Sequence, residues 1–336
     1  MPVSSSALNL AQYAVMSNEP MVKAVTFSLI DNGSVMARDI PFITKKSLYV
    51  NGVRWEGNLP TVNWVPLNQD PPNTIGTPTS FQEQVYLIRN VIDVDAAIVE
   101  DENQIQDPRA TQLDAYLKSV AYNFNNNFIN GDGATDVNAI VGLRKRIDNP
   151  TIYGVRSAAK IDAGGVVLTT AGLTAATANS FFQFLDQLLW ACDAPYGSPN
   201  LVLYVNDDLW RRLHFAVRSM GTTGGFAITQ DQFDRTIMTY KSCPLIDVGY
   251  LSDQSTRIIT STETNAGVNG ASTFTSIYAV NYSPGHFYGW QYDVLQARDL
   301  GLLNNGVTYR TVIDWRGGLI NDSNRSVGRI FDIKMT

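Results

Sequence analysis

The sequence predicts an α+β fold, in which helices and mostly antiparallel strands occupy separate stretches of the chain. One long amphipathic helix is expected at residues 107–131. Alternating apolar and polar residues indicate strands before this helix, from residue 45 to about residue 100, and again after residue 243. No pattern with a period of roughly 20 to 50 residues repeats, so a solenoid or propeller is not expected.

The central helix is marked at both ends. Asp107 can cap its first turn, and Pro108 suits the first helical position, where no backbone donor is needed. Gly131 follows the last apolar position, tolerates a positive φ and is expected to stop the helix. The face expected to pack on the rest of the molecule carries Leu113, Leu117, Val120, Phe124 and Phe128, and the polar face carries Asp114, Lys118, Asn125, Asn126 and Asn127.

Composition limits the class of function. Charged residues make up only 17% of the chain, below the roughly 25% of an ordinary soluble domain, so partners are expected to cover much of the surface. The net charge of −6 argues against a protein whose main task is to bind nucleic-acid phosphates. Cys192 and Cys243 are expected to be buried free thiols in a reducing compartment. We expect neither a signal peptide nor a membrane span.

The first 44 residues contain a helix-like patch followed by a second mixed stretch at residues 21–30. The patch consists of Leu8, Leu10, Ala11, Ala14 and Val15. Because these apolar residues are too few to fold alone, residues 1–44 are expected to form an arm that rests on another surface.

Residues 45–100 predict a long hairpin. Strands are expected in SLYVNGVRWEG, TVNWV and FQEQVYLIRNVIDVDAAIV, around a stiff tip, PLNQDPPNTIGTPTS, whose four prolines exclude a ladder. The hairpin has too many apolar residues to remain exposed and too little cover within its own domain. We therefore expect a neighbouring copy to cover it, through Arg54, Trp55, Val62, Trp64, Val65 and Leu67.

Further elements follow the central helix. The basic run Arg144, Lys145 and Arg146 is either a solvated edge or a partner for acidic groups of another subunit. A strand-like GGVVLTT precedes an amphipathic helix at residues 173–192, with Thr174 as its cap, and LVLYV is expected to be a buried strand. Asn206 is expected to cap a helix that carries Leu209, Trp210, Leu213 and Val217.

The last third of the chain is predicted to be mainly β. A short helix is expected at residues 230–240. Strands are then expected in CPLIDVGYL, RIITST, FTSIYAVNY, HFYGWQYDVLQARDLG, VTYRTVIDWRGGLI and RSVGRIFDIKM, the last two joined by the turn NDSN.

No constellation of residues indicates catalysis. The only histidines, His214 and His286, lie among apolar neighbours and are expected to be packed. Asp93 and Asp95 share one strand face, where solvation is the ordinary role. The segment around Asp136 lacks the glycine pattern of a phosphate loop and the glutamate of a calcium loop. We expect no enzyme activity, no cofactor and no metal site.

Four phrases carry a resemblance to a known family. They are LPTVNWVPLN, VIDVDAAIVED, FINGDGATDVNAIVGLRKRI and DWRGGLINDSNRSVGRIFDI. In their order and spacing the chain resembles the major capsid proteins of tailed phages, which have the Hong Kong 97 fold, and specifically the subgroup of short phage major structural proteins.

The resemblance implies a division of the chain into four parts. Residues 1–44 would be an N-terminal arm, and residues 45–92 an extended loop. Residues 93–174 and 304–325 would form a peripheral domain whose spine helix is residues 107–131. Residues 175–303 and 326–336 would form an axial domain.

The implied function is a virion shell. Copies of the chain would form pentamers and hexamers of an icosahedral capsid around packaged double-stranded DNA, without sequence-specific binding and without a membrane. Portal, scaffold and decoration proteins are further partners in such assemblies, and assembly would take place in the cytoplasm of the host bacterium. A negative net charge suits a shell that must not hold its DNA.

Three alternatives remain at this point. An encapsulin-like compartment would have the same fold and would hold a cargo enzyme instead of a genome. A β-rich enzyme would need a polar constellation that the sequence lacks, and a surface adhesin would normally carry a signal sequence.

Some members of the family join their subunits covalently, through a lysine of the extended loop. Asn304, Asn305 and Asp314 loosely match the acceptor and the acid of that reaction. The lysine is missing, because no lysine lies between Lys46 and Lys118. The resemblance therefore implies a shell without cross-links.

Overall fold

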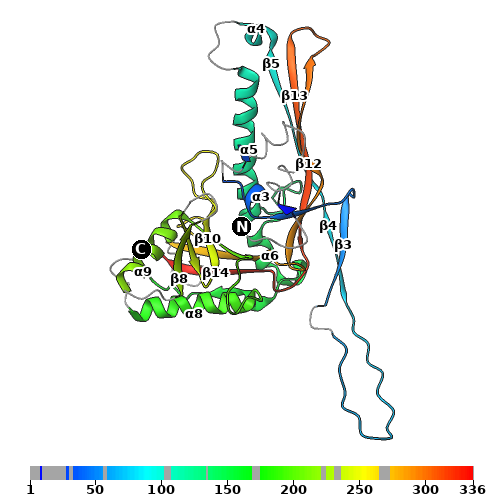
Figure 1. Ribbon diagram of the computed structural model, residues 1–336, viewed down its shortest axis with the longest axis vertical. Coiled ribbons are helices and arrows are strands. Elements are labelled where there is room, and N and C mark those ends of the chain that lie inside the picture. Colours follow the sequence, from blue (N-terminus) through cyan, green and yellow to red (C-terminus); the bar gives the residue numbers. More distant parts are fainter. Residues whose placement is uncertain are drawn as a thin grey trace.

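The computed structural model describes residues 8–9, 28–29, 33–55, 59–101, 107–133, 135–168, 175–220, 225–230, 236–264 and 273–335. The molecule is elongated (Figure 1). The long helix α5 (Pro108–Asn130) and the ends of two long strands lie at one end of it, and a hairpin with a long loop projects at the other. A second body of sheet and helices lies to one side.

A five-stranded sheet runs alongside α5 in the order β1-β2-β12-β13-β5. All neighbours in it are antiparallel except β2 and β12. The sheet joins segments from both halves of the chain, and β12, in the range expected for the axial domain, pairs along most of its length with β13 of the expected peripheral domain. Its strands are β1 (Leu8–Asn9), β2 (Pro41–Thr44), β5 (Tyr86–Asp95), β12 (Phe287–Leu302) and β13 (Thr308–Asn321).

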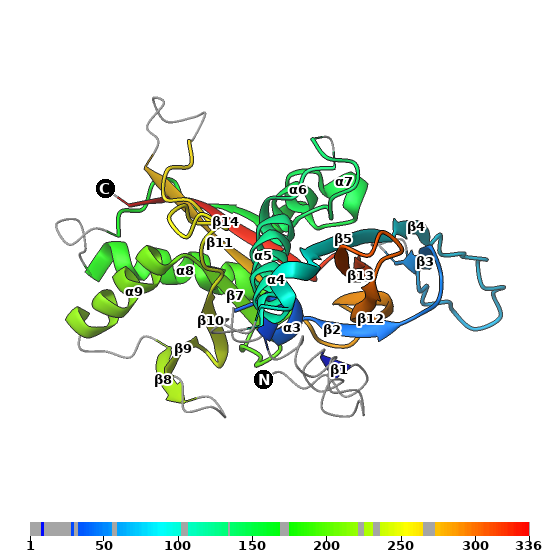
Figure 2. The same cartoon turned by 90° about the horizontal axis from the view of Figure 1, so that it is seen from above.

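A seven-stranded mixed sheet forms the second body, in the order β6-β14-β11-β7-β10-β9-β8. Helices α8 (Ala175–Ala191) and α9 (Asp207–Met220) lie beside it, as Figure 2 shows. Its strands are β6 (Lys160–Asp162), β7 (Leu201–Val205), β8 (Phe226–Gln230), β9 (Thr236–Tyr240), β10 (Cys243–Asp247), β11 (Phe274–Asn281) and β14 (Val327–Lys334).

The remaining elements are short. Strands β3 (Tyr49–Arg54) and β4 (Thr79–Gln84) form a separate two-stranded hairpin. The short helices are α3 (Val35–Arg38), α4 (Ala96–Val99), α6 (Leu143–Asp148), α7 (Pro150–Tyr153) and a 3₁₀ turn at Ser157–Ala159. Every described helix is too short or too polar to cross a lipid bilayer.

The predicted central helix is confirmed, with Asp107 accepting a hydrogen bond of 2.8 Å from the Arg109 amide. Its packing face is also as predicted, because Leu117, Val120, Phe124 and Phe128 are buried and Leu113 is partly buried against the same core. Phe124 packs edge-on against Trp315 of β13, with ring centroids 6.0 Å apart. Phe128 meets Tyr204 of β7 at 5.5 Å, so this one helix contacts both sheets.

Gly131 ends the helix as predicted, although its φ is −52°. Glycine is required there because a Cβ would lie 2.0 Å from the Ile140 carbonyl oxygen. One detail of this helix was predicted wrongly: Asn125 is buried rather than solvated. Its side chain accepts from the Val35 amide at 2.9 Å and donates to the Gly33 and Val248 carbonyls at 3.1 and 3.3 Å.

The described residues 33–42 of the expected N-terminal arm pack on their own subunit. Val35, Met36, Ala37 and Ile40 are fully buried in the same core as α5. Asp39 accepts a hydrogen bond of 3.1 Å from the Tyr204 hydroxyl, which ties this segment to β7. In the helix-like patch, the described residues Leu8–Asn9 form strand β1, and the other members lie outside the described residues.

Strands β7, β10, β11, β12, β13 and β14 confirm the corresponding predictions. The helix expected at residues 230–240 is wrong for residues 230 and 236–240, which belong to the antiparallel strands β8 and β9, and β9 also pairs with β10. Residues 231–235 lie outside the described residues. Three of the expected strands do not form among the described residues. Residues 61–65 form no strand, and residues 257–262 make only an isolated bridge at Arg257. The described residues of GGVVLTT likewise make only an isolated bridge, at Val167. Residues 96–99, expected at the end of a strand, form α4, capped by Asp95. Thr174, the expected cap of α8, lies outside the described residues.

Candidate assembly surface

The base of the β3–β4 hairpin is fastened to the five-stranded sheet. Val50 of β3 is buried with Trp290 of β12 and Ile320 of β13 in a small separate core. Phe81 of β4 packs on this core and also lies over Gly52, where a Cβ would come within 2.3 Å of its ring. A side chain at position 52 would therefore displace Phe81 and loosen the hairpin.

Arg54 belongs to this base. The sequence predicted that Arg54 contacts a neighbouring copy, whereas its side chain is buried within its own subunit. Its side chain is 5% exposed, lies 3.8 Å above the Phe81 ring centroid and donates to the Asn321 carbonyl at 2.7 Å. Arginine stacks readily on aromatic faces while it donates hydrogen bonds, which suits it to this buried role.

The basic run after α5, Arg144 to Arg146, also pairs with acidic residues of its own subunit. Arg146 is fully buried and donates to both carboxylate oxygens of Glu83 on β4, at 2.6 and 3.1 Å. Lys145 pairs with Asp132 at 3.0 Å, and Arg144 lies 3.8 Å from Glu263. All three residues of the run therefore have acidic partners in their own subunit, and sequence alone had left this open.

The distal loop of the hairpin, residues 59–78, has the opposite character. Trp64 is 98% exposed, and Val62, Leu67 and Ile75 are at least 80% exposed. Trp55 and Val65 are 53% and 38% exposed. Across the loop, the Thr74 hydroxyl donates a hydrogen bond of 2.9 Å to the Thr61 carbonyl. Figure 1 shows this loop projecting away from the rest of the molecule. The hairpin thus combines a firmly anchored base with an exposed apolar tip, and solvent-exposed apolar surface of this kind marks an interaction site.

A second surface lies on the five-stranded sheet. Asp314 of β13 is 9% exposed, and three arginines approach its Oδ2 atom. Arg89 of β5 donates to it at 2.9 Å, and Arg298 and Arg316 lie 3.8 and 3.9 Å away. Farther along the same strands, Arg310 forms a bidentate pair with Asp93, both bonds 2.7 Å long. Asp93 therefore forms a partly exposed ion pair between two strands, which is an ordinary role for a carboxylate on a sheet surface.

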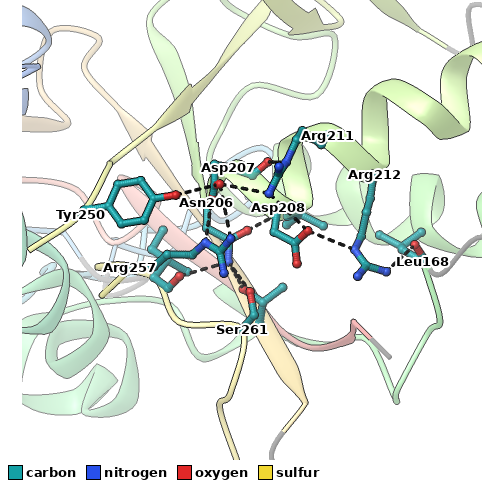
Figure 3. Close-up of polar contacts among 12 residues, drawn as sticks. Leu168, Asn206, Asp207, Asp208, Arg211, Arg212, Tyr250, Arg257 and Ser261 are labelled. Atoms are coloured by element: carbon teal, nitrogen blue, oxygen red, sulfur yellow. Dashed lines mark hydrogen bonds and ion pairs between the residues drawn. The ribbon is translucent and has the colours of Figure 1, made fainter. Parts of the chain in front are cut away.

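The third polar group, shown in Figure 3, connects α9 to the loop that follows β10. The predicted Asn206 cap is confirmed by a 2.8 Å bond from the Leu209 amide. The Asn206 amide also donates to the Ile259 carbonyl and the Ser261 hydroxyl, at 3.0 and 2.9 Å. Asp207 accepts from Arg257 and, at 2.9 Å, from Tyr250.

The Asp207 cluster is an anchor for the loop at residues 249–261. Burial raises the pKa of Asp207, but the hydrogen bonds from Arg257 and Tyr250, together with the charges of Arg257 and Arg211, lower it overall. An ionised carboxylate saturated by arginine and tyrosine donors suits a structural role better than proton transfer. Sequence reasoning identified the cap at Asn206 and missed the long-range partners.

The described part of the chain contains no group of three or more His, Cys, Asp or Glu residues placed to hold a metal ion. Cys192 and Cys243 are both buried and free, and burial raises the pKa of each thiol. Raised thiol pKa values disfavour the reactive thiolate. His214 stacks on Trp210 at 5.4 Å, whereas His286 precedes β12, 3.5 Å from Asp193, instead of standing in a strand.

Comparison with known proteins gives matches to shell-forming proteins. A family model described as major capsid protein GP7 matches residues 27–175, which include the hairpin and α5. The capsid of a native GTA particle is similar with a TM-score of 0.57, at 10% identity over 90% of each chain. The capsid of cyanophage A-1(L) has a TM-score of 0.53 at 12% identity, over 87% of this chain and 90% of that chain.

The SrpI encapsulin of Synechococcus elongatus PCC 7942 is also similar, with a TM-score of 0.56 at 12% identity. That match covers 98% of this chain and 96% of the encapsulin chain. At such identities the solved structures establish the shared fold. Comparison with curated protein sequences gives no match.

Proposed function

We propose that this chain, a phage major capsid protein with the Hong Kong 97 fold, closes an icosahedral shell of pentamers and hexamers around packaged double-stranded DNA. Self-assembly into the capsid and a place in the virion come with that identity. Portal, scaffold and decoration proteins are proposed as further partners, and the host cytoplasm as the place of assembly.

One observation carries the proposed mechanism of assembly. The hairpin loop exposes Trp64, Leu67 and Ile75 almost completely, although its base is fixed by a buried ion pair and a small core. An exposed apolar loop of this size is explained if a neighbouring copy covers it. We propose that residues 59–78, together with Trp55, form an intersubunit clamp, to which Val62, Trp64, Val65 and Leu67 also contribute.

The division into parts is proposed on the same basis. Residues 1–44 are assigned to the N-terminal arm and residues 45–92 to the extended loop. Residues 93–174 and 304–325 are assigned to the peripheral domain, with α5 as its spine. Residues 175–303 and 326–336 are assigned to the axial domain. The two sheets support two bodies, and the burial of residues 33–42 supports an arm that begins from a root in its own subunit.

The net charge of −6 supports a shell that encloses DNA without holding it. An encapsulin-like compartment is the second candidate, favoured by the match to the SrpI encapsulin over nearly the whole chain. Purified particles separate the two: copurifying double-stranded DNA supports the capsid, and a copurifying cargo protein in its place supports the compartment.

Deletion of residues 67–78 tests the clamp. Because the hairpin base and both sheets lie outside the deletion, the variant should remain a folded, soluble subunit with an unchanged unfolding midpoint. Electron micrographs should show no closed shells. A variant with Ile152→Ser removes a side chain that is 73% exposed on α7 and serves as the control that still assembles. Normal shells from the deletion variant would refute the clamp.

A further inference from the structure

An asparagine that is followed by glycine can lose its side-chain amide without an enzyme, because glycine leaves the next backbone nitrogen free to reach the asparagine Cγ atom. The chain contains five such pairs, and the structure describes both residues of three of them, Asn51–Gly52, Asn130–Gly131 and Asn305–Gly306. They lie in a strand, at the end of a helix and in a turn, respectively. Their surroundings therefore differ, although the reactive dipeptide is the same.

The Asn305–Gly306 pair lies in the turn that joins β12 to β13, and it is the one of the three described pairs in which both residues are exposed. Gly306 has a φ of 69°, and no atom would lie within 4 Å of a Cβ at this position. Water therefore reaches the asparagine amide, and nothing obstructs the glycine backbone.

Hydrogen bonds hold the Asn305 side chain in an arrangement that favours attack on its Cγ atom. Its Oδ1 atom accepts from the backbone amides of Val307 and Thr308, at 3.1 and 3.3 Å. Attack places negative charge on Oδ1, where these two donors stabilise it. Its Nδ2 atom donates to the Thr308 hydroxyl at 3.2 Å, and the same hydroxyl can give a proton to this nitrogen as it leaves.

The other two pairs are held in arrangements that oppose the reaction. Gly131 is buried, and the Asn130 side chain donates to the Ile258 carbonyl at 2.8 Å, which fixes its amide on another segment. Gly52 lies opposite Phe81 in the β3–β4 ladder, and a Cβ there would come within 2.3 Å of the Phe81 ring. Neither glycine nitrogen can move toward the asparagine without breaking regular structure.

We propose that Asn305 converts spontaneously to aspartate and isoaspartate in the folded subunit. The Gly306 nitrogen gives up its 2.9 Å hydrogen bond to the Leu303 carbonyl and forms a bond with Cγ of Asn305. The Cγ–Nδ2 bond breaks, and Nδ2 leaves as ammonia with the proton that the Gly306 nitrogen has lost. Water then opens the cyclic succinimide. Cleavage of its Cγ–N bond gives aspartate, and cleavage of its backbone C–N bond gives isoaspartate.

Either product changes the end of the β12–β13 hairpin, which Figure 1 shows at one end of the molecule. One carboxylate is added to a chain whose net charge is already −6. Asp95 of β5 lies opposite Thr308 in the sheet, so the new charge appears near an existing carboxylate. Isoaspartate also lengthens the backbone of the turn. Subunits of different age therefore differ in charge and backbone at this end, whether or not they have assembled.

Peptide mass spectrometry of aged, folded subunits tests the proposal. Trypsin places the three pairs in separate peptides, residues 47–54, 119–144 and 299–310. After storage at neutral pH, conversion of Asn305 should be at least about tenfold faster than conversion of Asn51 or Asn130. Digestion in heavy-oxygen water marks any conversion that occurs after unfolding. Conversion of Asn305 that is no faster than at the other two positions would overturn the proposal.

The same measurement on subunits kept unfolded in urea shows whether the turn causes the difference. The three pairs should then convert at similar rates, because the ladder, the helix end and the turn are all lost. The same ranking in urea as in water would assign the difference to local sequence and overturn the role of the folded turn.

Substitution of the glycine provides a matched comparison. Gly306→Ala should slow conversion of Asn305 at least about tenfold, because a methyl group beside the attacking nitrogen crowds its approach to Cγ. Gly301→Ala is the control, since Gly301 has the same φ of 69° and equally open surroundings but does not follow an asparagine. Urea midpoints verify that both variants fold. Conversion of Asn305 at the wild-type rate in folded Gly306→Ala would refute the proposed reaction.

Discussion

Arg146 on α6 and Glu83 on β4 form a bidentate ion pair, with bonds of 2.6 and 3.1 Å, beneath the projecting hairpin. The arginine side chain is fully buried and the glutamate side chain is 11% exposed. Arg146 also donates to the Val141 and Leu319 carbonyls, at 3.0 and 3.4 Å. This one guanidinium therefore links the hairpin, β13 and the segment after α5.

Arg146→Ala should lower the free energy of unfolding of the isolated subunit by about 3 to 5 kcal/mol, because it leaves a buried glutamate without its partner. Urea denaturation of the unassembled protein measures the loss. Lys145→Ala breaks the more exposed pair with Asp132 and should cost no more than about 1 kcal/mol. Equal losses for the two variants would contradict the importance of the buried pair.

Asn125→Ala should destabilise the subunit by about 2 to 4 kcal/mol. The substitution removes three hydrogen bonds and leaves the buried Val35 amide and two carbonyls without their partner. Asn126→Ala, on the neighbouring and partly exposed position, should change stability by less than about 0.5 kcal/mol. Thermal or urea unfolding of both variants checks the difference, and a loss for Asn126→Ala as large as that for Asn125→Ala would show that the assignment of the two faces is wrong.

Asp332 on β14 gives the subunit a dependence on pH. Burial raises the pKa of Asp332 to about 6, and the negative charges of Asp162 and Glu263 and a hydrogen bond with Asp162 contribute to the rise. The positive charge of Arg329 opposes the rise. Between about pH 4, the ordinary pKa, and pH 6 the folded state keeps a proton that the unfolded chain has lost. This group therefore makes the free energy of unfolding fall as pH rises through that window and stay level above it.

Asp332→Asn should remove that fall and make the subunit more stable than the wild type at pH 7. The substitution suits the backbone, because Asp332 has a φ of 61° and asparagine adopts this left-handed region more readily than most residues. Urea midpoints measured from pH 4 to pH 7 provide the test. A pH profile identical to that of the wild type would be evidence against the raised pKa.

Mature particles boiled in denaturant should give a single band near the 37.0 kDa of one chain. The segment between Lys46 and Lys118 contains no lysine, and the guanidinium groups of Arg54 and Arg89 stay protonated and cannot attack an asparagine. Lys45 and Lys46 lie before β3, at the base of the hairpin. A ladder of multimers on the gel would show a covalent link that these residues do not explain.

Local signals predicted the elements that depend on local physics. The α5 helix was identifiable because its cap, its first-turn proline and its apolar spacing are all encoded within about 25 residues. The exposed hairpin tip was also predictable, because prolines exclude a ladder and the apolar residues exceed what the hairpin could cover. The helix predicted at residues 230–240 failed because pairing of β9 with β10 overrides a weak local preference.

Residues of the candidate surface whose partners are distant in the sequence could not be predicted correctly. Asn125 looked like part of a polar face, and only its bonds to residues about 90 and 123 positions away show that it belongs to the core. Arg54 looked like a contact residue, and its partner Asn321 is 267 positions away. A polar residue looks the same in the sequence whether its side chain faces solvent or is buried with all its hydrogen bonds made. Sequence periodicity therefore cannot distinguish an exposed polar side chain from a buried one.

The subunit packs its cores with its own residues but leaves the tip of its hairpin loop exposed, and this difference affects the kinetics of assembly. The described cores, and the ion pair beneath the hairpin, are completed by residues of a single chain, whereas Trp64 and Leu67 lie in water. Folding of such a subunit is a unimolecular reaction whose rate does not change on dilution. Shell closure is multimolecular and depends steeply on the concentration of folded subunits. We therefore expect folded subunits to accumulate without shells up to a threshold concentration, and shells to account for nearly all protein added beyond it.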